Sequence, residues 1–317
     1  MQYSLMNRFR GALLGSFVGE ILGSVSCQGK VLGKATLTLP KGGDTQLNQM
    51  LSDWSQIATC GAESLIRHGR LDVEDWVLQV GRVHSPLLLL KTAASSHQAA
   101  IATLPMALFF HEDQVKLRQQ LLQAAAVWQQ DSEAFEGVLA VAYAIALALT
   151  EKLDVATLIP QTLAYLGTSQ TPLVQQLEQV QTILQQGGAL DTTLTQLRRD
   201  AQRRGNPSGC PNTSIALAFY CFLNTPEDFR LCVTRAALTR YQPQITTALT
   251  GALCGVYNSL TGIPVGWRLA ATQTLAGVQR LQLADDLLAV WSGVYEVPAT
   301  DQFPRLAVAA PHVIQPR

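Results

Sequence analysis

Residues 8–24 read RFRGALLGSFVGEILGS and indicate the architecture around which the rest of the chain is built. The apolar residues of this stretch recur with the period of an α-helix, which predicts a wide buried face. Glycine also recurs at every fourth position, at Gly11, Gly15, Gly19 and Gly23. Because this spacing leaves a strip of bare backbone on one face, another helix or a loop can approach closely. We therefore predict a first helix at the centre of the fold.

The helical period continues along nearly the whole chain, in segments separated by Gly, Pro or polar breaks. This pattern predicts an all-α protein. After the first helix we expect helices over residues 45–67, 73–83, 101–110, 115–128, 133–150, 155–166, 173–186, 192–204, 213–223, 226–238, 245–260, 267–278 and 281–291. Gly69 is expected to stop the helix 45–67, and Pro226 to lie in the first turn of the helix 226–238.

These helices are expected to form one domain over residues 1–292. The Gly- and Pro-containing loop at residues 205–209 is the densest break in the chain, but we do not expect it to separate two domains. Residues 293–317 contain four prolines, which predicts an extended C-terminal tail.

Composition excludes several classes of protein. Of the 317 residues, 48% are hydrophobic and 15% are charged, so the chain is not globally disordered. Lys plus Arg equals Asp plus Glu at 23 each, which argues against a nucleic-acid partner. The longest apolar run, residues 137–149, falls short of the ~20 residues that span a bilayer. With no leader-like segment at the start, we expect no membrane span and a cytoplasmic location.

Four stretches resemble, in order, the landmarks of the ADP-ribosylglycohydrolase family. They are RFRGALLGSFVGEILGS at residues 8–24, QAAIATLPMALFF at 98–110, SIALAFYCFL at 214–223 and ITTALTGALCGVYNSLTGIPVGWR at 245–268. The resemblance implies an orthogonal bundle of helices with two Mg²⁺ ions in a cleft, where the glycosidic bond of an ADP-ribosylated side chain is hydrolysed. Two such ions lie close together only where several carboxylates neutralise them.

The residues at the metal positions depart from the pattern that the resemblance implies. The family motif Thr-Asp-Asp-Thr, at the start of a helix, is matched to Gly42, Gly43, Asp44 and Thr45, so that one acid remains. The second motif, Asp-Thr-Asp-Thr, is matched to residues 242–245.

In this second motif Gln242 and Gln244 replace the two acids, and Ile245 replaces a hydroxyl ligand. Neutral amides and a hydrocarbon cannot balance the charge of two dications, so we predict that the two-metal site does not form and that no cofactor is bound.

Glu20, Asp44 and Cys27 each allow a functional and a structural interpretation. Glu20 lies in an apolar helix, where a buried carboxylate needs a donor or a solvated pocket, and both roles stay open. Asp44 is a metal ligand or, as we favour, the N-cap of the helix that starts at Thr45. Cys27 has no histidine nearby in the sequence, so we expect a small apolar filler rather than a nucleophile. The other cysteines are expected to be buried thiols.

Three functions are compatible with these residues. The first, which we favour, is a catalytically inactive ADP-ribosylglycohydrolase-like protein that acts as a binding or regulatory subunit of an unidentified protein partner, with an ADP-ribose-like molecule as a candidate ligand. The second is an active hydrolase that uses Glu20, Asp44 or acids such as Asp131 and Glu133 without metal. The third is a structural subunit of a larger complex.

Overall fold

The computed structural model describes residues 3–27, 51–83, 95–125, 132–167, 171–203, 211–296 and 306–308. The helices of the first half are α1 (Leu5–Cys27), α3 (Asp53–His68), α4 (Val73–Val83), α6 (Ser96–Ala102), α7 (Leu104–Phe109), α8 (Gln114–Ala125) and α9 (Ser132–Leu149). Those of the second half are α10 (Leu158–Leu166), α11 (Pro172–Gln185), α12 (Leu190–Arg203), α13 (Pro211–Asn224), α14 (Phe229–Leu238), α15 (Pro243–Gly262), α16 (Val265–Thr272) and α17 (Leu275–Trp291). The predicted all-α architecture is confirmed.

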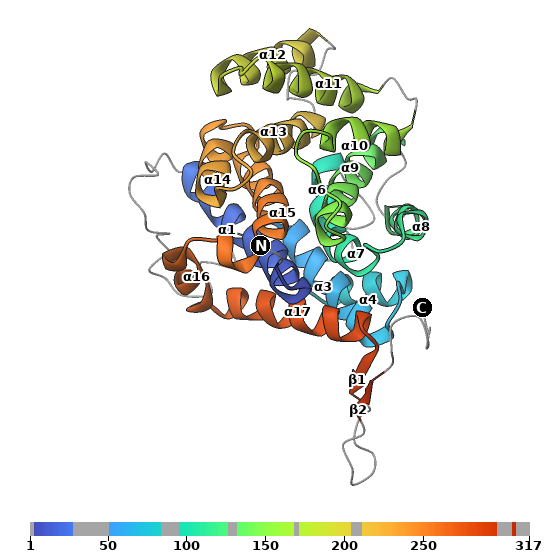
Figure 1. Cartoon of the computed structure of the whole chain (residues 1–317). Coiled ribbons are helices and arrows are strands. Elements are labelled where there is room, and N and C mark those ends of the chain that lie inside the picture. Colours follow the sequence, from blue (N-terminus) through green and yellow to red (C-terminus); the bar gives the residue numbers. More distant parts are fainter. Residues whose placement is uncertain are drawn as a thin grey trace.

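The centre of the molecule is the crossing of α1 with α15 (Figure 1). A Cβ atom placed on Gly11 would collide with the carbonyl oxygen of Gly255, and one on Gly255 would collide with that of Gly11. Gly15 and Gly251 exclude each other's Cβ in the same way. The two backbones therefore touch directly, as the four-residue glycine spacing predicts, and α1 is buried along most of its length.

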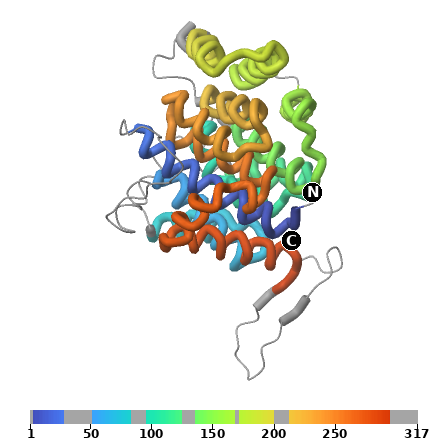
Figure 2. Tube along the Cα trace, turned by 60° about the vertical axis from the view of Figure 1, so that its left-hand side comes forward, coloured from blue at the N-terminus to red at the C-terminus, as the bar shows by residue number. Residues whose placement is uncertain are grey.

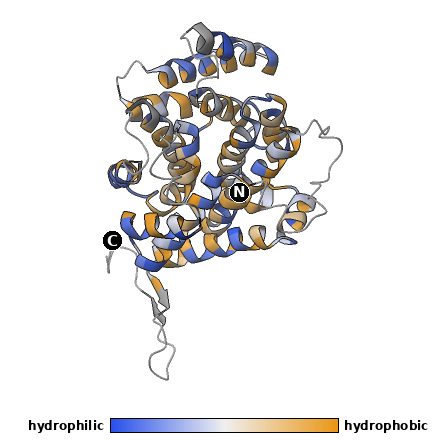
Figure 3. Cartoon of the chain, turned by 180° about the vertical axis from the view of Figure 1, so that it is seen from behind, coloured by the Kyte–Doolittle hydropathy of each residue, from blue (hydrophilic) through white to orange (hydrophobic). Residues whose placement is uncertain are grey.

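The remaining helices surround this pair. Figures 1 and 2 show α11 and α12 at one end of the molecule, beyond α13, and α17 running along the opposite end beneath α1 and α3. Arg10 of α1 donates two hydrogen bonds of 2.6 Å to the carboxylate of Asp285, which fastens α17 to the central helix. Hydrophilic residues lie mostly on the outer sides of the peripheral helices (Figure 3).

A capping side chain starts each of three helices, so that α3 and α14 begin later, and α17 earlier, than their apolar patterns predict. The side chain of Ser52 accepts a hydrogen bond from the backbone N–H of Ser55, so α3 starts at Asp53. The prediction of a helix from residue 45 is therefore wrong at residues 51–52. Asp228 caps α14, so Pro226 precedes the helix rather than opening it. Thr274 caps α17, so the break between the last two helices lies at residues 273–274 and not near residue 280, as the expected helices 267–278 and 281–291 require.

Two further boundaries concern the segment 101–110 and the tail. The single helix expected over 101–110 is two helices, α6 and α7, which meet at Thr103, since Pro105 has no N–H to continue the first one. After α17 the chain forms two short antiparallel strands, β1 (Val294–Glu296) and β2 (Leu306–Val308), which pair Val294 with Val308. Among the described residues, no helix is long and apolar enough to cross a membrane.

Candidate functional site

Glu20 lies where α1, α3 and α15 meet, and only 1% of its surface is exposed. The glycines beside it explain how α15 reaches this point. A Cβ on Gly19 would collide with the backbone of Thr247, and one on Gly23 would collide with the backbone of Pro243. The bare face of α1 therefore lets the first turn of α15, with Gln244, pack directly over Glu20.

Hydrogen-bond donors of the protein surround the Glu20 carboxylate. The backbone N–H of Ser52 donates to Oε1 at 2.5 Å, and the hydroxyl of Ser55 donates to Oε2. The amide nitrogen of Gln244 also donates to Oε1, at 3.2 Å. Both carboxylate oxygens are thus engaged by the start of α3 and the start of α15, so Glu20 joins the three helices at one point.

Arg280 brings the opposite charge to this network from α17. Its Nη2 donates to the backbone oxygen of Ser55 at 3.2 Å, and its Nη1 donates to the hydroxyl of Thr59. Ser55 therefore bridges the two charges, because its hydroxyl reaches Glu20 and its carbonyl receives Arg280. Burial raises the pKa of Glu20, and the hydrogen bonds from Ser52 and Ser55 and the charge of Arg280 oppose that rise. Burial also lowers the pKa of Arg280, against the charges of Glu20 and Glu63.

The first turn of α15 holds the residues matched to the second metal motif. Gln242 adopts the left-handed conformation (φ 41°, ψ 53°) as the N-cap, without a hydrogen bond from its side chain to the helix. Ile245 is buried, with 8% of its surface exposed. Of the three replaced positions, only Gln244 contacts Glu20, and it does so as a donor.

The structure does not describe several of the other predicted site residues. Gly42, Gly43 and Asp44 lie outside the described residues, as does Asp131, and the side chain of Glu133 is not described. Cys27 is exposed, so its expected role as an apolar filler is wrong, and partial burial raises the pKa of its thiol, which does not favour a nucleophile. Cys60, Cys221, Cys232 and Cys254 are buried free thiols, as predicted.

Three residues of this network, Ser52, Ser55 and Arg280, are not among those predicted from the sequence. Ser52 and Ser55 carried a usable signal, since a hydroxyl residue just before a helical apolar pattern is typical of an N-cap. Arg280 carried none, because its position in the helical pattern is that of an ordinary polar residue near the core boundary.

The described residues do not fit a pair of Mg²⁺ ions. Among them, no group of three or more His, Cys, Asp or Glu side chains is placed so that it could hold a metal. Hard dications require oxygen ligands, and a pair of them close together needs several carboxylates to balance the charge. Both oxygens of Glu20 already accept hydrogen bonds, and Gln244 turns its amide nitrogen, which is not a metal ligand, toward them.

A pH-dependent difference in stability is expected between the parent chain and Glu20→Gln. A raised pKa means that the fold favours the protonated carboxyl, so this contribution is fully present below the ordinary value of 4.5 and is lost as the pH rises through the raised value. Glutamine cannot ionise. Thermal unfolding of both proteins at a series of pH values should therefore show the parent losing stability relative to the variant as the pH rises, and parallel curves would contradict the raised pKa.

The chain is similar to known proteins in both sequence and structure. The sequence profile of the ADP-ribosylglycohydrolase family matches residues 1–296. A search of the curated proteins finds no match. Among solved structures, the chain resembles one described as an "ADP-ribosylglycohydrolase-related protein complex", with 20% sequence identity and a TM-score of 0.62. This likeness covers 90% of the chain and 99% of the other, and it shows a shared fold.

Proposed function

Because the chain belongs to the ADP-ribosylglycohydrolase family, we propose that it is a member that has lost the two-metal hydrolysis and acts as a binding or regulatory subunit. The single observation that carries this proposal is the contact between Gln244 and Glu20. A hydrogen-bond donor occupies the side of the carboxylate that a cation would need, and the carboxylate is used to hold three helices together.

The start of α3 supports the same proposal. The family motif Thr-Asp-Asp-Thr belongs at the start of a helix, and the observed helix start carries Ser52, Asp53, Trp54 and Ser55. We propose this stretch as the counterpart of the motif in place of residues 42–45, which lie outside the described residues, because Ser52 and Ser55 contact Glu20. In this placement the two hydroxyl positions are kept and bind Glu20 or cap the helix, Asp53 is exposed, and Trp54 stands where the second acid would be.

A hydrolase that works without metal has little support at this site. Acid and base catalysis of glycoside hydrolysis uses two carboxyl groups that face the scissile bond from opposite sides. Glu20 is 1% exposed and its oxygens are committed to Ser52, Ser55 and Gln244, so it does not face a cleft from which a substrate could be protonated.

Metal binding and turnover test this proposal separately. Calorimetric titration of the full chain with MgCl₂ is expected to show no saturable binding. Incubation with an ADP-ribosylated peptide and excess Mg²⁺ is expected to release no ADP-ribose. The double variant Gln242→Asp, Gln244→Asp restores two acids at the start of α15 and is expected to gain Mg²⁺ affinity relative to the parent. Magnesium-dependent release of ADP-ribose by the parent chain would refute the loss of hydrolysis.

A further inference from the structure

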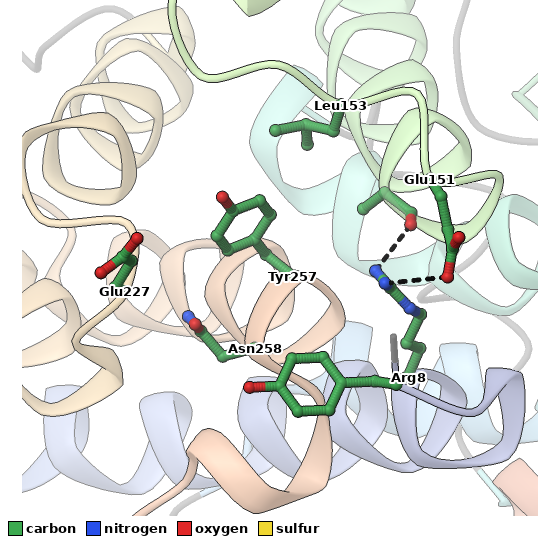
Figure 4. Close-up of a pocket in the computed structure, with 8 residues that line it drawn as sticks. Arg8, Glu151, Leu153, Glu227, Tyr257 and Asn258 are labelled. Atoms are coloured by element: carbon green, nitrogen blue, oxygen red, sulfur yellow. Dashed lines mark hydrogen bonds and ion pairs between the residues drawn. The ribbon is translucent and has the colours of Figure 1, made fainter. Parts of the chain in front are cut away.

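A cavity lies at the end of α1 away from Glu20. Arg8, on its wall, precedes Glu20 by twelve residues, which is about 18 Å along a helix. The cavity has a volume of about 670 Å³, within the usual range for small-molecule sites. Besides Tyr3 and Ala148, the residues labelled in Figure 4 line it, and they come from α1, the segment after α9, the turn before α14, and α15: Arg8, Glu151, Leu153, Glu227, Tyr257 and Asn258.

Arg8 is the one cation among the described residues that line this cavity, and the protein already uses it. Arg8 donates from Nη1 to the backbone oxygen of Ala148 at 2.8 Å, at the C-terminal end of α9, and from Nη2 to Oε1 of Glu151 at 3.3 Å (Figure 4). Its guanidinium also lies 5.9 Å from the ring centre of Tyr3. The charge of Arg8 is therefore offset by Glu151 and by the end of α9, although its buried Nε has no hydrogen-bond partner among the described residues.

The opposite wall carries a carboxylate without a compensating charge. Glu227 is exposed and has no hydrogen-bond or ion-pair partner among the described residues. Tyr257 projects between Glu227 and Glu151 (Figure 4). Burial raises the pKa of Tyr257, and the charges of Glu227 and Asp154 raise it further, against Arg8. The cavity thus combines a net negative field with a phenol ring that stays neutral.

The wall that carries Glu227 and Tyr257 is held in a fixed shape. Asn258 donates from Nδ2 to the backbone oxygen of Pro226 at 2.6 Å and to that of Cys254 at 3.1 Å, so the turn with Glu227 is tied to α15. The next residue, Ser259, has the conformation φ 62° and ψ −178° inside α15, and Glu151 across the cavity has φ 59°. Such conformations are costly for residues other than glycine and persist only where the surroundings enforce them.

We propose that this cavity binds an organic cation, an alkylammonium or guanidinium group, between the carboxylate of Glu227 and the ring of Tyr257. A carboxylate and an aromatic face together are the partners that such cations take. A metal ion does not fit, because no three acidic, His or Cys side chains converge among the described residues. An anion does not fit either, because it would meet Glu227 while Arg8 is engaged. The proposal is independent of whether hydrolysis has been lost at Glu20.

The ligand could come from two sources, which the test separates. Agmatine, which carries both cationic groups, serves as the free small molecule, and the peptide Gly-Arg-Gly with blocked ends serves as the side chain of a partner protein. Each is titrated into the full chain in a calorimeter at low salt. Saturable binding of agmatine assigns a free amine, and binding of the peptide alone assigns a basic side chain of a partner. Either outcome supports the organic-cation site, and failure of both probes to bind overturns it.

Three variants locate the binding in this cavity. Glu227→Gln is expected to lower the affinity for the probe about tenfold, because one charge-assisted hydrogen bond is lost. Tyr257→Leu is expected to weaken it about fivefold, whereas Tyr257→Phe, which keeps the ring, leaves it within about twofold. Glu74→Gln, which removes an exposed acid from α4, is the matched control and should change nothing. An affinity equal to that of the parent in either Glu227→Gln or Tyr257→Leu would overturn the proposal.

Discussion

Replacing Gly15 by alanine is expected to lower the free energy of unfolding by about 3 kcal/mol, the cost of overpacking a site that cannot relax. The added Cβ would collide with the carbonyl oxygen of Gly251 and lie 3.1 Å from the ring of Phe229. A flexible side chain can move away from a new methyl group, but a helix backbone cannot. The two central helices would have to separate, and every residue packed along their crossing would lose contact.

Gly81 provides the matched control for this substitution. It lies inside α4, and a Cβ placed there meets no atom within 4 Å. Gly81→Ala should therefore raise the free energy of unfolding by as much as ~1 kcal/mol, the difference in helix propensity. Chemical denaturation followed by circular dichroism measures both variants. If Gly15→Ala were as stable as the parent, the direct backbone contact between α1 and α15 would be excluded.

The core of this fold could be predicted from the sequence because its glycine and apolar residues recur with the period of a helix. Four glycines at four-residue spacing predict a close helix–helix contact, and the structure supplies the partner in α15. The helix over residues 73–83 is also found as predicted. The predicted starts of the helices were less accurate. Ser52, Asp228 and Thr274 begin their helices through one local hydrogen bond each, and such a bond leaves no trace in the apolar period.

The site could be predicted only in part. Glu20 was recognisable as an acid in an apolar helix that must find donors, and the family resemblance pointed to Gln244. Their contact, however, depends on how closely α15 approaches α1, which is a property of the packed structure. Arg280 lies 260 residues beyond Glu20 in the sequence, and it enters the site only because α17 packs against α3. No local pattern encodes that arrangement.

Replacing Glu20 by alanine is expected to lower the free energy of unfolding by about 4 kcal/mol, more than any other single substitution at this site. The change leaves the backbone N–H of Ser52 and the hydroxyl of Ser55 without their acceptor, and it removes the charge that compensates buried Arg280. Glu20→Gln keeps one carbonyl oxygen and the size of the side chain, so it should cost roughly half as much. Denaturant titration of the full chain measures both losses.

A double-mutant cycle with Arg280→Leu isolates the interaction of the two charges from the loss of packing. Each single variant leaves one buried ion without its counterpart, whereas the double variant Glu20→Ala, Arg280→Leu leaves none. The double variant should therefore lose less stability than the sum of the singles, by about 1–3 kcal/mol. The bridging position of Ser55 gives the reason, since its hydroxyl and its carbonyl join the two side chains across α3. Losses that add to within about 0.5 kcal/mol would show instead that Glu20 and Arg280 stabilise the fold independently.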